Sequence, residues 1–334
     1  MPGFSGLRTW WAGRPPAAGA AVMASGIVSV GLHLTGPETV SLVFLWLACL
    51  AWLALAADFA VRLVTQRPRW LAEAKSPGAL SAVAATTVVG TRFSLLGRQT
   101  LAEAALALAV LLWPVLLLLV VRHWGRRMPG AVFLCCVATQ GLAVLAATLA
   151  AAETTAWLAR AALLLFWLGL VLYGLALARF DPRQVLEGAG DHWIAGGALA
   201  ISALAGAKLL AADSARLYLW NDDDRGVLRD VTVTLLALDL ACCVVLLAAE
   251  VARPRLRFDV RRWSTVFPLG MTASSTLSVA AVLNIGWLRS PGQVLVWLAV
   301  AVWLAVAAGA VLAARAGLVR ARQGALSLRS TARR

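Results

Sequence analysis

The sequence predicts an all-α polytopic membrane protein with ten transmembrane helices, and three observations support this fold class. Of the 334 residues, 61% are hydrophobic and 14% are charged, whereas soluble domains are usually about 45–50% apolar and about 25% charged. Apolar runs of roughly 20 residues, long enough to cross a bilayer, recur along the whole chain. Basic residues gather in short clusters between these runs, as is typical of membrane proteins.

Hydropathy and helix-breaking residues define the ten predicted spans. They cover residues 15–34, 40–64, 78–96, 101–121, 130–150, 156–178, 192–211, 230–250, 263–285 and 293–314. No cleavable signal-peptide pattern precedes the first span, so we expect it to be retained as a membrane helix. Residues 1–316 form one predicted transmembrane domain, and the basic segment 317–334 is expected to be a disordered cytoplasmic tail.

The basic residues also predict the orientation in the membrane. The two termini and the loops after even-numbered spans hold 22 Lys and Arg residues, whereas the loops after odd-numbered spans hold 7. Cytoplasmic loops are enriched in Lys and Arg. We therefore expect a multi-pass protein of the cell (cytoplasmic) membrane with both termini in the cytoplasm.

The spans alternate in composition. Odd-numbered spans are rich in Ala, Gly, Ser and Thr, whereas most even-numbered spans are dominated by Leu and Trp. Small residues allow helices to pack closely, and large apolar residues suit contact with lipid. We therefore expect five inner helices in a ring around a path, each joined as a hairpin to one of five outer helices. An ordinary bundle without a path is the alternative.

Neither the charge nor the cysteines predict another class of function. The net charge is +14, but the arginines flank apolar runs instead of forming one surface, so we expect no nucleic-acid partner. All five cysteines lie within apolar runs, where thiols behave as small buried hydrophobes. They are Cys49, Cys135, Cys136, Cys242 and Cys243.

Ionisable residues inside a membrane are the default functional candidates. Arg92, near the outer end of the third span, and Lys208, in the seventh, are predicted to form a vestibule that attracts anions. For Lys208, the alternative is an ammonium group that extends to the interface. Asp239 lies in the middle of the eighth span, too deep to ionise at low cost in lipid. We expect it to be protonated, hydrogen-bonded to a neighbour or part of a proton path.

An acidic segment, Asn221-Asp222-Asp223-Asp224-Arg225, raises an enzyme alternative. Intramembrane prenyltransferases hold Mg²⁺ and diphosphate with aspartate-rich motifs, because hard cations prefer clustered oxygens. Here the fifth position is Arg225, and no second acidic cluster lies on a predicted cytoplasmic loop, so a solvated loop is favoured. HExxH, P-loop and Gly-x-Ser-x-Gly patterns do not occur. We expect no enzyme activity, cofactor or metal site.

The ninth span has the most distinctive sequence. It carries a Phe-Pro pair followed by Gly, Met and several hydroxyl-bearing residues. A helix that faces only lipid does not need small hydroxylated residues, whereas a helix beside a close neighbour or a water-filled path does. We expect Ser264, Pro268, Thr272 and Ser275 to border the path.

The segment WSTVFPLGM at 263–271 resembles the Trp-x-x-x-Phe-Pro-Leu segment of the tellurite-resistance and C4-dicarboxylate transporters, which are related to the plant slow anion channels. The segments GDHWIAGG at 190–197 and VMASGI at 22–27 support the resemblance. The ten-span plan extends it over nearly the whole chain. One departure is that the third, fifth and seventh spans lack the mid-helix prolines that often kink the pore helices of that family.

The resemblance implies five helical hairpins in a quasi-fivefold arrangement, odd helices that line a pore, and a homotrimer. It also implies a phenylalanine that plugs the pore from the ninth helix, and Phe267 is the matching residue. An aromatic ring across a narrow path is a plausible gate, since hydrophobic constrictions can close a pore by dewetting.

The favoured function is therefore an anion channel or transporter gated by Phe267. Small anions, C4-dicarboxylates such as malate, sulfite and tellurite are the substrates that the resemblance suggests. Two alternatives stay open, namely a membrane-embedded enzyme that uses Asp222–Asp224 and a non-transporting membrane scaffold or sensor. A channel and a proton-coupled carrier are not distinguished, because Asp239 could serve the carrier or only pack.

Overall fold

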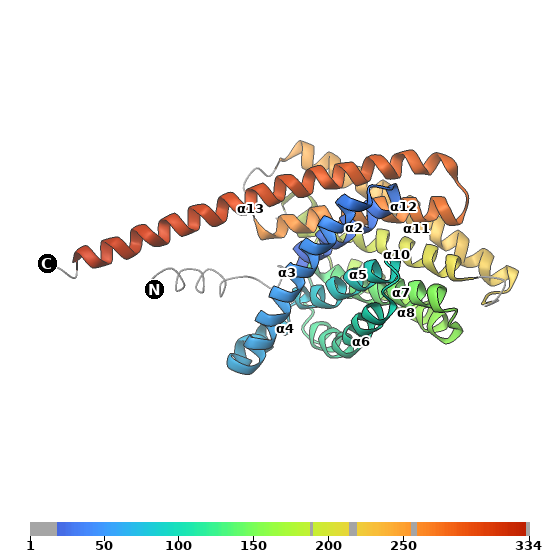
Figure 1. The fold of residues 1–334 in the computed structure, drawn as a ribbon, viewed down its shortest axis with the longest axis horizontal. Coiled ribbons are helices and arrows are strands. Elements are labelled where there is room, and N and C mark those ends of the chain that lie inside the picture. The colour runs from blue at the N-terminus through green and yellow to red at the C-terminus, as the bar shows by residue number, and fades with distance from the viewer. Residues whose placement is uncertain (1–18, 188–189, 214–218, 255–258, 332–334) are drawn as a thin grey trace.

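The computed structural model describes residues 19–187, 190–213, 219–254 and 259–331, and its architecture is helical (Figure 1). Within this part of the chain no β-strand is present, and a helix occupies each predicted span. These helices are α2 (Gly19–Thr35), α3 (Glu38–Thr65), α5 (Ser81–Leu95), α6 (Gln99–Val121), α7 (Leu134–Glu153), α8 (Ala156–Leu177), α10 (Ile194–Ala212), α11 (Asp222–Ala252), α12 (Trp263–Val282) and α13 (Arg289–Thr331). The protein is all-α, as predicted.

Short elements connect the long helices. The 3₁₀ helices η2 (Pro77–Leu80), η3 (Gly130–Phe133), η4 (Asp191–Trp193) and η5 (Val260–Arg262) lead directly into α5, α7, α10 and α12. All four lie at the end of the bundle where α3, α6, α8 and α11 finish, together with α4 (Arg67–Ala74) and α9 (Gln184–Glu187). We call this the basic end, because the Lys- and Arg-rich loops lie there, and the other the opposite end, where η6 (Gly286–Leu288) precedes α13.

Eight helices in the described residues are long and apolar enough to cross a membrane. Of the ten helices, α2 and α5 fall short of that length, with 17 and 15 residues, while a bilayer core takes about 20. The first predicted span begins at residue 15, and residues 15–18 lie outside the described part. Ten crossings therefore stay a prediction.

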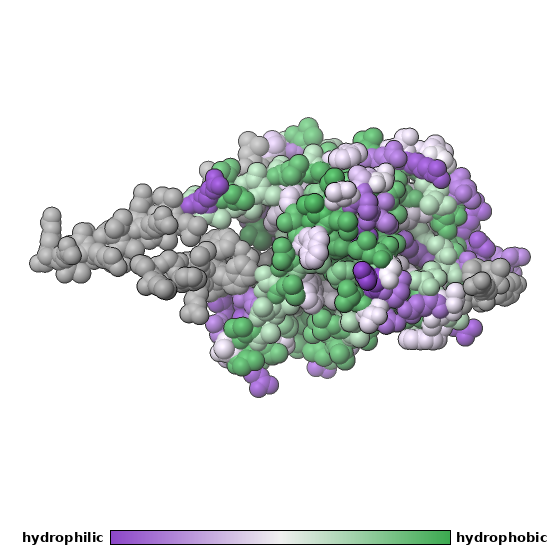
Figure 2. All heavy atoms as spheres, viewed as in Figure 1, coloured by the Kyte–Doolittle hydropathy of each residue, from purple (hydrophilic) through white to green (hydrophobic). Residues whose placement is uncertain are grey.

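The surface of the bundle is apolar over its middle. Leu111 and Leu164 are each 72% exposed, and Trp46 is 68% exposed. Figure 2 shows hydrophobic residues spread across the middle of the visible face and hydrophilic residues mostly toward its two ends. Water-soluble monomers rarely expose so continuous an apolar surface. The chain is therefore a polytopic membrane protein.

The inner helices α2, α5, α7, α10 and α12 form a closed ring, in which each packs against the next and α12 returns to α2. Each inner helix also packs against the outer helix that follows it in the chain. An apolar 18-residue stretch within Gly130–Glu153, the span of η3 and α7, is entirely buried, whereas the corresponding stretch of α6 is 17% buried. This packing agrees with the predicted inner ring wrapped by outer helices.

Glycines allow the close approach of these helices. A Cβ at Gly141 of α7 would lie 2.4 Å from Oγ1 of Thr87 on α5, and a Cβ at Gly206 of α10 would lie 2.1 Å from Oγ1 of Thr232 on α11. Both distances are far below van der Waals contact, so any larger residue would force the helices apart. This is the physical reason for the small residues of the odd spans.

The ring closes at a seam between the first and last hairpins. α12 packs along α2, and α13 packs on its outer side. The indole Nε1 of Trp303 on α13 donates a hydrogen bond to Oγ of Ser25 on α2 at 2.9 Å. The rings of Trp303 and Phe44 on α3 meet edge to face, with centroids 4.9 Å apart. These contacts join helices from the two ends of the chain.

The structure extends two helices beyond the predicted spans. α11 begins at Asp222 instead of residue 230. α13 continues to Thr331, so the backbone of residues 317–331 is helical, whereas the division into a transmembrane domain at 1–316 and a cytoplasmic tail at 317–334 stays a prediction. That segment is rich in Ala, Leu and Arg, which are strong helix formers, and lacks proline. Adding residues to an existing helix needs no new nucleus. Residues 332–334 lie outside the described part.

Candidate functional site

Phe267 lies at the centre of the inner ring. Its side chain is fully buried. The next residue, Pro268, lies inside α12 and has no N–H to donate to the carbonyl of Ser264, which locally weakens the helix ladder. A Cβ at Gly197 of α10 would lie 3.2 Å from Cε1 of Phe267 and 3.0 Å from Cγ of Pro268. Gly197 therefore makes room for the Phe-Pro pair.

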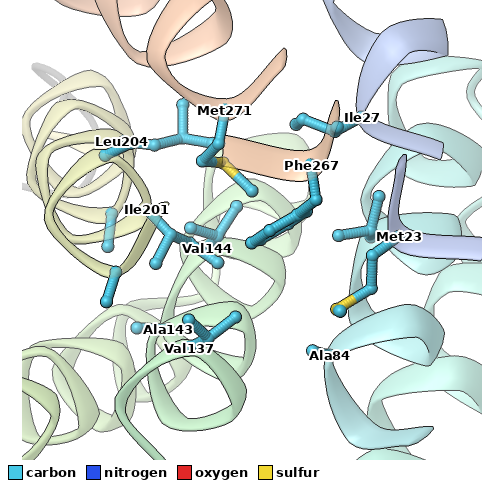
Figure 3. Close-up of a cluster of buried hydrophobic side chains, with 14 of the residues drawn as sticks. Met23, Ile27, Ala84, Val137, Ala143, Val144, Ile201, Leu204, Phe267 and Met271 are labelled. Atoms are coloured by element: carbon cyan, nitrogen blue, oxygen red, sulfur yellow. The ribbon is translucent and has the colours of Figure 1, made fainter. Parts of the chain in front are cut away.

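All five inner helices supply apolar side chains around Phe267 (Figure 3). The cluster comprises Met23 and Ile27 of α2, Ala84 of α5, Val137, Ala143 and Val144 of α7, Ile201 and Leu204 of α10, and Met271 of α12. Figure 3 shows the ring of Phe267 between Met23 on one side and Val144 and Ile201 on the other. The ring of helices is thus filled with hydrocarbon at this level.

The apolar side chains around Phe267 make this level of the ring unfavourable for an ion. An ion among these apolar side chains would lose its water, and burying an unpaired charge is very costly. Hydrophobic constrictions can close a pore.

Lys208 lies on the opposite-end side of these apolar side chains. It follows Ile201 by seven residues and Leu204 by four on α10, so it shares the helix face that these two residues direct toward Phe267. Lys208 is partly exposed, and no hydrogen bond or ion pair joins it to another described residue. Its place next to a path for anions stays a prediction.

Arg92 lies in a different environment from the predicted vestibule. It is fully buried, and its Nη2 donates to Oγ of Ser41 at 3.0 Å. It also forms an ion pair with Glu38, and its Nε lies 3.2 Å from Oγ of Ser29. Glu38 in turn contacts Nδ1 of His33 at 2.6 Å. Arg92 therefore ties α5 to α2 and α3 and is paired with a carboxylate, and its predicted part in the anion pathway stays a prediction.

Asp239 forms a hydrogen bond with the gate helix. Oγ1 of Thr272 on α12 donates to its Oδ1 at 3.0 Å, and both side chains are buried. The other oxygen, Oδ2, has no hydrogen-bond partner among the described residues. Thr272 thus points toward α11, and its predicted place in the lining of the path stays a prediction. The expected partnership of Asp239 with a neighbour is present.

The remaining hydroxyl candidates also lie on α12. Ser264 precedes Met271 by seven residues and Ser275 follows it by four, so both share the helix face of Met271. Both are buried. Oγ of Ser275 donates to the carbonyl oxygen of Thr272 at 3.0 Å, which leaves its hydroxyl oxygen able to accept a further hydrogen bond. Their contact with a permeating ion stays a prediction.

Sequence reasoning missed the apolar partners of Phe267 because it searched for polar and charged candidates. A usable signal was present in the spacing. Met23 and Ile27 are four residues apart, as are Phe267 and Met271, and Val137 and Val144 are seven apart. In an inner helix this spacing places two large side chains on one face. Two large apolar residues spaced by four or seven positions in a helix of small residues therefore indicate where the centre of the ring is filled.

The acidic cluster is part of a helix terminus. The side chain of Asn221 accepts a hydrogen bond from the N–H of Asp224 at 2.7 Å, and Asp222 to Asp224 form the exposed first turn of α11. Asn is a favoured N-cap residue, and acidic residues in the first turn interact favourably with the helix dipole. These contacts explain the cluster as a helix start, in place of the solvated loop that the sequence favoured. No group of three or more potential metal ligands occurs in the described residues.

The fold and its filled centre define a class of protein: an all-α polytopic membrane protein in which five hairpins enclose a central axis. Comparison with known families is more specific. Residues 14–311 match the SLAC1 family, described as voltage-dependent anion channels, and the chain belongs to this family. This result confirms the resemblance and supports a channel or transporter over an enzyme.

Two curated relatives are similar over a shorter range. They are the uncharacterized membrane proteins MT1776 and Rv1735c of Mycobacterium tuberculosis strains CDC 1551 and H37Rv. Each is 30% identical to this chain over 137 residues, which is 40% of this chain and 64% of the relative. The match thus covers less than two thirds of either relative, and their descriptions add membrane residence only.

Proposed function

We propose that this protein passes small anions across the cell membrane through the ring of α2, α5, α7, α10 and α12, and that Phe267 closes this route. The convergence of all five inner helices on one buried phenylalanine carries the proposal. Moving the single aromatic side chain of Phe267 would open the narrowest part of this route without rearranging the helices. Side-chain rotation is fast compared with helix movement.

The charges on the inner helices favour anions over cations. The sequences of α2, α5, α10 and α12 contain no Asp or Glu, and that of α7 contains only Glu153 at its last position. Lys208 adds a positive charge on the opposite-end side of Phe267. A path with cationic and hydroxyl groups but without carboxylates attracts anions and repels cations.

The finer features of the proposal follow the family resemblance. We infer that the substrates are small inorganic anions or C4-dicarboxylates such as malate, with sulfite and tellurite as further candidates. We also infer a homotrimer in the cytoplasmic membrane with both termini inside the cell. The distribution of 22 Lys and Arg at the basic end and termini against 7 at the opposite end supports that orientation.

The decisive experiment is anion flux into proteoliposomes with chloride, nitrate and malate, comparing wild type and Phe267→Ala. We expect Phe267→Ala to raise the flux at least about tenfold, which corresponds to a barrier lower by about 1.4 kcal/mol. Phe166→Ala is the matched control, because Phe166 is equally buried but belongs to the outer helix α8. Both changes remove a buried ring and cost about 3–5 kcal/mol of stability, so only the position relative to the axis differs.

The filled interior also favours a second candidate, a membrane scaffold or sensor that transports nothing. Phe267 and its neighbours from all five helices are packed without exposure to solvent. If neither wild type nor Phe267→Ala carries any of the three anions while both remain folded, the scaffold interpretation replaces the transport proposal.

A further inference from the structure

A cavity lies between the first two hairpins, away from the ring axis. Its volume is about 270 Å³, close to the lower end of small-molecule sites at about 300–1,000 Å³. The outer helices α3 and α6 and the short helix α4 form its walls. The inner helices α2 and α5 form its floor. It lies toward the basic end, where α3 finishes and α5 begins.

The walls of the cavity are aromatic and held in place. The rings of Phe59 and Trp70 meet edge to face with centroids 5.3 Å apart, and Nε1 of Trp52 donates to Oγ1 of Thr86 at 2.9 Å. The floor consists largely of small residues, including Ala82. Fixed large walls around a small-residue floor make a preformed site for an apolar ligand.

The charged groups at its rim neutralise one another. Arg62 pairs with Asp58 and with Glu73, both at 2.8 Å, and Arg69 pairs with Glu73 at 3.1 Å. Two cations and two anions leave no net charge to select an ionic ligand. The cavity is therefore unsuited to the anions proposed for the ring.

One polar atom beside the cavity lacks a partner. Nε1 of Trp70 is buried and has no hydrogen-bond acceptor among the described residues. That atom has almost no accessible surface, so a ligand in the cavity would contact the hydrocarbon of the indole and not its N–H. The chemistry of the site thus suits a hydrocarbon chain.

The cavity is continuous with the surface that faces lipid. Leu108, which lines it, is 36% exposed on α6, and Ala56 lines it from the half-buried side of α3. We propose that the cavity binds part of one acyl chain of a membrane phospholipid, drawn from the leaflet at the basic end, with the chain against the aromatic wall of Phe59 and Trp70. Its volume is too small for the whole lipid.

The test uses the full chain in vesicles that contain phosphatidylglycerol with a diazirine in its acyl chain. Irradiation followed by mass spectrometry should find cross-links on the cavity residues of α3, α5 and α6. Ala82→Phe places a ring in the cavity, and we expect at least about a tenfold loss of these cross-links, because each displaced methylene removes a factor of about four in affinity. Ala107→Phe is the matched control, since Ala107 is exposed on α6 and does not line the cavity.

Further arms identify the ligand and allow for misfolding. Trp70→Ala removes part of the aromatic wall that lines the cavity, so we expect about a fivefold loss of labelling, and this holds even if Ala82→Phe does not fold. Cross-links to the exposed lipid-facing residue Leu164 should stay unchanged in every variant. Labelling of the cavity no stronger than that of Leu164, or unchanged in both cavity variants, would overturn the proposal. Labelling by a free diazirine fatty acid but not by the phospholipid would overturn the choice of phospholipid.

Discussion

Arg92 and Lys208 are both basic residues of inner helices near the opposite end, yet their surroundings differ. Arg92 is fully buried, with Glu38, Ser29 and Ser41 around its guanidinium group. Lys208 is partly exposed on the helix face directed toward Phe267, and no described carboxylate pairs with it. The comparison teaches that position along a helix does not decide the role of an intramembrane cation. That role depends on the helix face that carries the cation and on the residues that the cation contacts.

The largest effect should follow from Arg92→Ala. Removing the guanidinium group deletes the link between α5, α2 and α3 and takes one hydrogen-bonding partner from each of Ser29, Ser41 and Glu38. We expect a loss of about 3 kcal/mol in the free energy of unfolding, measured by denaturation in detergent. Arg261→Ala is the control, because Arg261 forms an exposed pair with Asp259 at 3.2 Å and such pairs contribute about 0–1 kcal/mol. A stable Arg92→Ala protein with altered anion flux would reverse the comparison.

A smaller effect, on transport alone, should follow from Lys208→Met. Loss of the positive charge on the axial face should lower anion flux in proteoliposomes about tenfold, a difference of about 1.4 kcal/mol, with little change in thermal stability. Lys208→Arg keeps the charge and should retain most of the flux. Equal flux in all three proteins would mean that Lys208 only extends to the interface.

The smallest effect should follow from Thr272→Val, which removes the donor to Asp239. A buried carboxyl oxygen then loses its partner, at a cost of about 1–2 kcal/mol in stability, while flux per folded protein stays unchanged. Thr276→Val is the control, since that hydroxyl donates only to the carbonyl oxygen of Thr272 in its own helix, at 2.6 Å. Altered flux with unaltered stability would place Thr272 in the lining of the path.

Composition was enough to predict the arrangement of the helices. Small residues in odd spans and large ones in even spans record which helices are surrounded by protein and which meet lipid, so the ring of α2, α5, α7, α10 and α12 could be predicted. The position of Phe267 was expected from the resemblance, and the structure places that residue among side chains of all five inner helices.

The direction of individual side chains could not be predicted in the same way. Thr272 is a small polar residue on an inner helix, as the path hypothesis required, but it points toward Asp239 on α11. Arg92 has its partner Glu38 on a different helix, and no spacing rule links residues 54 positions apart. The cavity between the first two hairpins depends on the separation of α3 and α6 around α5. That separation is set by helix packing and cannot be predicted from hydropathy.

The seam between α12 and α2 has a consequence for biosynthesis. Ring contacts between α2, α5, α7, α10 and α12 follow chain order except at this seam, where the first inner helix meets the last. During synthesis, which adds about 5–20 residues per second, the small-residue flank of α2 must wait for nearly the whole chain to be inserted. Trp303 then secures the closure by its bond to Ser25. A ribosome that stops before α12 would leave the ring incomplete and this surface of α2 uncovered. Membrane quality control recognises such uncovered helix surfaces.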